Sequence, residues 1–161
     1  MEYFLNPGEL IFSKEPMVIK TVLGSCVAVT IFDKVNRWGG MCHYLLPIAP
    51  ANLKSTKYGD VAIKYLIKKF IDNGSDIKNL EATITGGAFI IFSAREIFFV
   101  GDRNVDVAEN ILRERKVYIK YRNTGGENGR KVVFSTEYNV INVEIIKEIR
   151  VEDLYRDGKV V

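Results

Sequence analysis

The sequence predicts a single-domain α/β protein, a layered sandwich in which two main helices cover a mixed β-sheet. Its 161 residues are 47% hydrophobic and 27% charged, which is enough apolar material for one core. Two segments repeat their apolar residues at helical spacing, between short apolar runs of strand length. Hairpin signals at both ends of the chain favour a mixed sheet over a doubly wound parallel one. We expect residues 1–161 to form one domain, with a C-terminal tail of uncertain role from about residue 144.

Apolar or β-branched runs bounded by turn residues predict the strands. These runs cover residues 17–22, 26–32, 41–46, 80–85, 117–121, 132–135 and 140–146. Helical spacing predicts one helix from about Tyr58 to Asn73 and a second from about Asp102 to Lys116. Glu137 to Asn139 is the expected turn of the last hairpin.

Charge and hydropathy exclude several classes of protein. The formal net charge is +3, from 23 Lys and Arg against 20 Asp and Glu, so a nucleic-acid partner is not expected. Lys64, Lys68 and Lys69 are typical of the solvated face of a helix. No run approaches the roughly 20 apolar residues of a membrane helix. Met1 to Pro16 lacks the pattern of a signal peptide, so we expect a soluble, cytoplasmic protein with reduced thiols and no membrane insertion.

The chain has one histidine, His43, and two cysteines, Cys26 and Cys42. A site with several histidine ligands is therefore excluded, and without a Cys-x-x-Cys pair a structural zinc site is not expected. Cys42 and His43 are neighbours on a strand and should face opposite sides. An antiparallel hairpin that pairs Cys26 with His43 would turn within Asp33–Asn36. A register one or two residues away would still leave Cys26 and His43 close.

A cysteine hydrolase needs a thiolate, a base and donors for the oxyanion. Gly24 and Ser25 are small enough to let a substrate carbonyl and backbone amides approach Cys26. The hydroxyl of Thr21 is a candidate to fix the tautomer of His43. The alternative from spacing alone is that Cys26 is a small buried hydrophobe and His43 a satisfied core residue. We expect Cys42 to fill the core.

Six segments in the same order resemble the chemoreceptor glutamine deamidase family, known as CheD. The segments are TVLGSCVAVTIFD (21–33), GGMCHYLLP (39–47), YGDVAIKYLI (58–67), ITGGAFIIF (84–92), GDRNVDVAENIL (101–112) and NTGGENGRKVVF (123–134). The resemblance covers nearly the whole chain, from about residue 19 to about residue 143. It implies a three-layer α/β fold similar to the catalytic cores of deamidating toxins.

The resemblance also implies a Cys-His-Thr triad that converts receptor glutamines to glutamates and releases ammonia. Cys26 matches the nucleophile, His43 the base and Thr21 the third member. The mechanism implied is a Cys26 thioester, hydrolysed by water that His43 activates, with no metal or organic cofactor. Turn amides between Gly24 and Cys26 are the expected oxyanion donors.

The implied partners are the cytoplasmic domains of chemoreceptors, as substrates, and a chemotaxis phosphatase of the CheC type. The alternative function is a regulatory binding partner of that phosphatase with little or no deamidase activity. A third interpretation is a thiol protease or small-molecule amidase. Tyr44 and the polar loop 51–57 are candidates for a receptor-binding surface, although such a loop is more often a connection. Gly86 and Gly87 are expected to serve backbone geometry, and Arg103 and Asn104 to shape the start of a helix.

Overall fold

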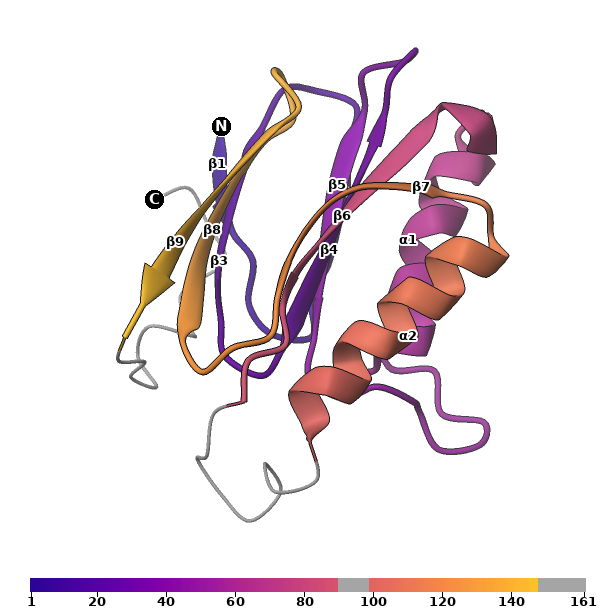
Figure 1. Cartoon of the computed structure of the whole chain (residues 1–161). Coiled ribbons are helices and arrows are strands. Elements are labelled where there is room, and N and C mark those ends of the chain that lie inside the picture. Colours follow the sequence, from indigo (N-terminus) through magenta and orange to yellow (C-terminus); the bar gives the residue numbers. More distant parts are fainter. Residues whose placement is uncertain (90–98, 148–161) are drawn as a thin grey trace.

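The protein is built in three layers, as the computed structural model shows for residues 1–89 and 99–147 (Figure 1). Two β-sheets face each other, and two helices cover the free face of one of them. The strands are β1 (Glu2–Phe4), β2 (Leu10–Ser13), β3 (Val18–Leu23), β4 (Val27–Asp33), β5 (Gly39–Tyr44), β6 (Leu80–Gly86), β7 (Tyr118–Thr124), β8 (Gly129–Ser135) and β9 (Val140–Ile146). The helices are α1 (Gly59–Asp72), the short 3-10 helix η1 (Ile77–Asn79) and α2 (Val100–Glu114).

The predicted α/β class is confirmed, but the strands form two mixed sheets instead of one. The outer sheet has the order β1-β3-β8-β9, and the central sheet, which carries the helices, has the order β2-β5-β4-β6-β7. The parallel pairs are β1 with β3 and β6 with β7. The predicted hairpins β4–β5 and β8–β9 both form. They belong to different sheets because the chain stays in the central sheet from β4 to β7 and crosses to the outer sheet after β7.

The predicted helices agree with α1 and α2, whereas several strands differ from their predicted ranges. Strand β7 ends at Thr124 instead of residue 121, and β8 begins at Gly129 instead of residue 132. Strands β1 and β2 were not predicted, because three or four residues of mixed polarity carry little pattern. Both lie at sheet edges and form through pairing with β3 and β5. Strand β5 begins at Gly39, earlier than predicted, because its two glycines belong to the sheet. A Cβ on Gly40 would lie 2.7 Å from the Ile11 carbonyl oxygen, so the close packing of β2 requires glycine there.

Two apolar cores lie on the two faces of the central sheet. Val27, Val29 and Ile31 of β4 pack with the helices in one core. Ala28 and Phe32 of the same strand pack against the outer sheet in the other core. Strand β4 is buried on both faces, which explains why its sequence is an almost continuous apolar run. In the C-terminal tail, whose role the sequence leaves open, residues 148–161 lie outside the described part of the chain.

The turn at residues 24–26 carries the chain from the outer sheet to the central sheet. It packs against the glycine pair that ends β6. Gly86 has φ +112°, and a Cβ there would lie 2.3 Å from the Cys26 carbonyl oxygen. The amide of Gly87 donates to that same oxygen at 2.9 Å. The glycine pair therefore supports the turn that carries Cys26, in agreement with its predicted role in backbone geometry.

Within residues 1–89 and 99–147, no helix is both long and apolar enough to cross a membrane.

Replacing Gly86 by alanine should destabilise the fold more than the same change at Gly74. Both glycines have φ above 100°, so both variants carry the strain of an L-residue in that region, about 1–2 kcal/mol. A Cβ added at Gly74 would have no atom within 4 Å, whereas one added at Gly86 would meet the Cys26 backbone. We expect Gly86→Ala to lose about 1–3 kcal/mol more in the free energy of unfolding, measured by urea denaturation. Equal losses in the two variants would contradict this packing argument.

Candidate active site

His43 lies in the space between the two sheets and is fully buried. It belongs to β5 of the central sheet, and its Nδ1 lies 2.7 Å from the hydroxyl of Thr21 on β3 of the outer sheet. The Thr21 hydroxyl in turn donates to the carbonyl of Leu5 at 2.8 Å. The structure thus brings two of the three predicted site residues into direct contact.

These contacts fix the tautomer of His43. A hydroxyl has one proton, and the Thr21 proton is used in the bond to the Leu5 carbonyl. The Thr21 oxygen must therefore accept, so Nδ1 of His43 carries the hydrogen and Nε2 keeps its lone pair. Among the described residues, no hydrogen-bond partner reaches Nε2, although the atom is buried. Nε2 is thus a base with an uncommitted lone pair.

Burial keeps the imidazole neutral. Desolvation lowers the pKa of His43 to about 3, and a backbone hydrogen bond with Leu5 opposes this only in part. A neutral imidazole can accept a proton, as a general base must. The same burial makes a permanent imidazolium costly.

Cys26 lies just before β4, two positions from the predicted pairing. In the observed register Ala28 is opposite His43, and Val27 is opposite Tyr44. The expected direct pairing of Cys26 with His43 is therefore wrong by two residues. Because side chains alternate with period two, this shift leaves Cys26 on the same face of the hairpin as His43. Cys26 is half-buried and packs against the core between the two sheets.

Cys42 lies on the other face of β5, as predicted. It is buried in the core beneath the helices. Burial raises the pKa of the Cys42 thiol to about 12, which keeps it protonated at neutral pH. Of the two cysteines, only Cys26 combines access to solvent with the face that carries His43.

The turn that carries Cys26 is held from two sides. On one side, the amide of Ala88 donates to the Gly24 carbonyl at 3.1 Å. On the other, the side-chain amide of Asn104 on α2 donates to the Ser25 carbonyl at 3.0 Å and to the Leu45 carbonyl at 2.9 Å. Asn104 is fully buried. Sequence reasoning gave it only a role in shaping the start of a helix.

A signal for Asn104 was present in the sequence. It lies three, four and seven residues before Val107, Ala108 and Ile111, which are buried residues of α2. A polar residue on the apolar stripe of a helix must find partners inside the protein. Here those partners are the backbone carbonyls of the site.

Unpartnered buried polar atoms surround this site. In the described part of the chain, three buried side-chain atoms have no hydrogen-bond partner, namely His43 Nε2, Thr85 Oγ1 and Asn104 Oδ1. His43 and Thr85 flank Ala28 in one row of the central sheet. Such atoms cost stability, and their concentration at one place is typical of a functional site.

The predicted receptor-binding surface needs one correction. Tyr44 is fully buried, and its hydroxyl donates to the backbone carbonyl of Asn104, so it is not a surface residue. In the loop 51–57, Leu53 is exposed. Phe89 and Phe99 are also exposed, and their rings lie 5.5 Å apart. Phe89 directly follows Ala88, which is bonded to the Cys26 turn. Residues 90–92, the end of one family-like segment, lie outside the described part.

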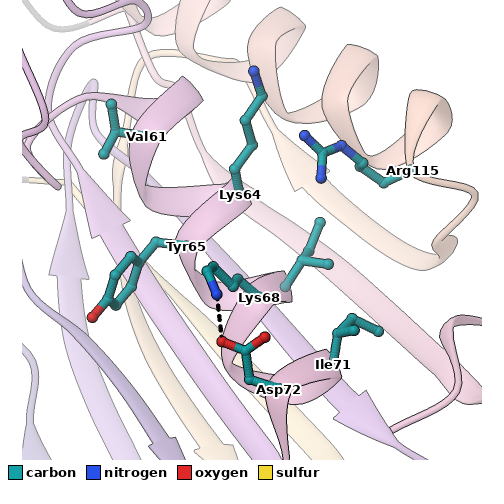
Figure 2. Close-up of a pocket in the computed structure, with 8 residues that line it drawn as sticks. Val61, Lys64, Tyr65, Lys68, Ile71, Asp72 and Arg115 are labelled. Carbon is teal, nitrogen blue, oxygen red and sulfur yellow. Dashed lines mark hydrogen bonds and ion pairs between the residues drawn. The ribbon is translucent and has the colours of Figure 1, made fainter. Parts of the chain in front are cut away.

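A groove of about 420 Å³ runs along α1, on the far side of the central sheet from His43, and Arg115 lines its other side. Lys64 of α1 and Arg115 after α2 flank it (Figure 2). Lys68 at its rim pairs with Asp72 at 2.5 Å. The groove contains neither cysteine nor histidine, so we do not assign the chemistry to it. No group of three or more metal-ligating side chains comes together in the residues that the structure describes.

Comparisons with known proteins point to one family. Residues 45–145 match the family model described as "CheD chemotactic sensory transduction". A protein of Rhodospirillum rubrum named "Probable chemoreceptor glutamine deamidase CheD" is 40% identical over 151 residues, which cover 94% of this chain and 86% of that protein. A protein of Sulfurimonas denitrificans with the same name is 35% identical, covering 92% of this chain and 98% of its own. In Anaeromyxobacter dehalogenans, "Probable chemoreceptor glutamine deamidase CheD 1" is 38% identical, with coverages of 84% and 80%.

The matched range of the family model begins after His43. The Rhodospirillum rubrum alignment leaves out only about ten residues of this chain, so it extends over the positions of Thr21, Cys26 and His43.

The buried position of His43 predicts an unusual titration. Because the chain has a single histidine, its imidazole proton signals in NMR spectra are unambiguous. We expect them not to titrate between pH 8 and pH 5 in the folded protein, since burial lowers the pKa of His43 from 6.5 to about 3. A folded-state midpoint near 6.5 would contradict the buried geometry.

The same shift predicts a dependence of stability on pH. Between pH 6.5 and about 3 the unfolded chain binds a proton at His43 that the folded chain does not. The contribution of neutral, buried His43 to the free energy of unfolding is therefore fully present above pH 6.5 and is lost as the pH falls towards 3. Urea denaturation of a His43→Gln variant should show a shallower loss over this window.

Proposed function

Because the chain belongs to the CheD family, we propose that it hydrolyses the side-chain amide of glutamine residues in chemoreceptors, with Cys26 as nucleophile. The observation that carries this proposal is the state of His43. Its Nδ1 is held by Thr21 and its Nε2 lone pair is uncommitted on the face that carries Cys26. This is the arrangement that a thiol nucleophile and its base require.

In the proposed first half-reaction, Nε2 of His43 accepts the proton of the Cys26 thiol. The sulfur attacks the carboxamide carbon and forms a C–S bond, and the carbonyl oxygen becomes an oxyanion. When the tetrahedral intermediate collapses, the C–N bond breaks, and the nitrogen takes the proton from His43 and leaves as ammonia. The product is a thioester between Cys26 and the former glutamine side chain.

The second half-reaction returns the enzyme to its starting state. Water gives a proton to Nε2 of His43 and attacks the thioester carbon. The C–S bond then breaks, the Cys26 sulfur recovers the proton, and a glutamate side chain is released. The residues of the chain supply the nucleophile and the proton transfers. That turn amides at residues 24–26 stabilise the oxyanion stays a sequence-based prediction.

Thr21 acts as the orienting group in this proposal. A threonine hydroxyl is neutral, so it fixes the ring and the tautomer of His43 without the charge that an aspartate would bring. Together with burial this favours a neutral imidazole at rest. The proton transfer is then coupled to substrate attack instead of preceding it.

The receptor-binding surface is proposed to include the exposed aromatic residues beside the Cys26 turn. Phe89 and Phe99 offer apolar area next to Ala88, which contacts the turn directly. Aromatic side chains of this kind contribute much of the binding energy at protein interfaces. The resemblance implies a helical receptor segment as the substrate, and an exposed helix face fits against such an aromatic pair.

The alternatives differ in what they require. A regulatory partner of a CheC-type phosphatase needs a binding surface but no paired thiol and imidazole. Burying an imidazole with an unpartnered Nε2 costs stability, and binding alone gives no reason for that cost. A thiol protease or small-molecule amidase would use the same residues on another substrate.

A receptor cytoplasmic fragment incubated with the protein should show conversion of glutamine to glutamate by peptide mass spectrometry. We expect conversion with the wild type and none with Cys26→Ala, because the thioester cannot form without the sulfur. Cys42→Ala is the matched control, with the same substitution at the other cysteine of the chain, and should retain turnover. Conversion by Cys26→Ala would remove Cys26 from the mechanism. No conversion by the wild type would favour the regulatory-binding alternative.

Thr21→Val should lower kcat by about 10-fold or more, because the isosteric change removes the acceptor that holds the Nδ1 hydrogen of His43. It also leaves the buried Leu5 carbonyl without this donor, at a cost of about 1–3 kcal/mol in stability. Thr21→Ser keeps the hydroxyl and should keep most of the activity. Steady-state kinetics at a temperature where all forms are folded tests this. Equal kcat values in the valine and serine variants would show that the hydroxyl has no role.

A further inference from the structure

We propose that Asn104 is a positioning residue of this site, which holds the Cys26 turn in register with the strand of His43. The part of the proposal that concerns turnover rests on the proposed deamidase function. The part that concerns the geometry of Cys26 does not.

The side-chain amide of Asn104 joins two segments that carry the two reacting groups. It donates to the carbonyl of Ser25, the residue before Cys26, at 3.0 Å. It also donates to the carbonyl of Leu45, two residues after His43, at 2.9 Å. Both hydrogens of the amide group are thereby used.

The bridge lies where the sheet itself no longer fixes the geometry. The ladder between β4 and β5 ends at the pair Val27 and Tyr44. Ser25 lies two residues before β4 and Leu45 directly follows β5, so both are outside the ladder. Asn104 therefore continues the connection between the strands from the helix side. On the side of β6, the amides of Gly87 and Ala88 donate to the Cys26 and Gly24 carbonyls of the same turn.

The bond to Ser25 also orients the peptide group that Cys26 shares. A trans peptide is planar, with its carbonyl and its N–H on opposite sides. Because the Ser25 carbonyl points to Asn104, the amide of Cys26 points away from Asn104. Loss of the bond would release rotation of this peptide, and with it the Cα–Cβ direction that aims the Cys26 sulfur.

The orientation of the Asn104 amide follows from its partners. Exchanging its oxygen and nitrogen would place Oδ1 against two carbonyl oxygens, which is repulsive. In the present orientation Oδ1 is buried without a hydrogen-bond partner among the described residues. A fully buried amide with an unpartnered oxygen is costly to the fold. Because a buried asparagine with an unpartnered oxygen is costly, its presence here is best explained by the two hydrogen bonds that it donates to the backbone of the site.

The backbone of Asn104 is itself held in place. The Tyr44 hydroxyl donates to its carbonyl oxygen, and Tyr44 is the last residue of β5. Helix α2 is thus attached to the end of the His43 strand at two points, through a side chain and a backbone carbonyl. Helix α2 therefore contacts both the turn that carries Cys26 and the end of the strand that carries His43, and so fixes the position of one relative to the other.

The variants for the test are Asn104→Ala and Asn104→Asp, with Val107→Ala as the matched control. The aspartate has the size of asparagine but presents no N–H donors to the two carbonyls. Val107 is a buried residue one turn further along α2, in the core beneath the helices, so its truncation loosens the packing of the helix without touching the turn. All forms are compared at a temperature where circular dichroism shows them folded.

The first readout is deamidation kinetics. We expect both Asn104 variants to lose about 100-fold in kcat with KM changed less than about threefold, because Asn104 positions the nucleophile and does not touch the substrate. Val107→Ala should keep kcat within about threefold of the wild type, even if its melting temperature falls as much as those of the Asn104 variants. A Val107→Ala loss equal to that of the Asn104 variants would overturn the proposal.

The second readout needs no substrate and separates this proposal from the proposed function. The alkylation rate of Cys26 by iodoacetamide is followed against pH by peptide mass spectrometry in each variant, with His43→Gln as the reference. We expect the Asn104 profiles to resemble that of His43→Gln, because a displaced thiol no longer has His43 as its neighbour. Wild-type profiles in the Asn104 variants would overturn the positioning role. A shift of these profiles, with no deamidation by the wild type, would support the positioning role while the proposed function fails.

If neither Asn104 variant folds, Tyr44→Phe serves as the second test. It removes only the hydroxyl that holds the Asn104 backbone and keeps the ring in the core. We expect a severalfold loss of kcat and a partial shift of the alkylation profile towards that of His43→Gln. A wild-type profile in Tyr44→Phe would overturn the proposal.

Discussion

The hydrogen bond between Thr21 and His43 joins the two sheets, and the geometry of the candidate site depends on it. Thr21 belongs to the outer sheet and His43 to the central sheet, and both are fully buried. The Thr21 hydroxyl donates its hydrogen bond to the Leu5 carbonyl, so its oxygen accepts from His43, whose hydrogen is therefore on Nδ1. A contact that crosses two packed layers thus decides which nitrogen can act as a base.

Burial sets the protonation state of the His43 imidazole and leaves polar atoms around it without partners. Desolvation lowers the pKa of His43 to about 3, so the imidazole of the resting site is neutral. A neutral imidazole is less costly to bury than an imidazolium. The unpartnered Nε2, Thr85 Oγ1 and Asn104 Oδ1 are the polar atoms that this arrangement leaves in the described interior.

The position of Cys26 depends on the same two layers. Its turn is the crossing from the outer sheet to the central sheet, supported by the glycines that end β6 and by Asn104 of α2. Gly86 cannot carry a side chain because the Cys26 carbonyl occupies that space. Residues that are far apart in the sequence, from β6 and from α2, thereby contact the same turn.

Much of the fold follows from local pattern. The helices, the β4 and β6 strands and the two hairpins could be predicted, because apolar spacing and turn residues act over a few positions. The two short edge strands could not, since their stability comes from pairing with β3 and β5. The distribution of the strands over two sheets was also not visible in the spacing, because hairpin signals do not say which sheet a hairpin joins.

The sequence by itself determined the residue types of the candidate site and the strand faces on which they lie. With one histidine, and with Cys42 next to it on a strand, alternation alone directed attention to Cys26. Only the tertiary structure decided the two-residue shift in register, the tautomer of His43 and the burial of Tyr44 and Asn104. These depend on contacts between layers, and a linear pattern carries no information on which layer packs against which.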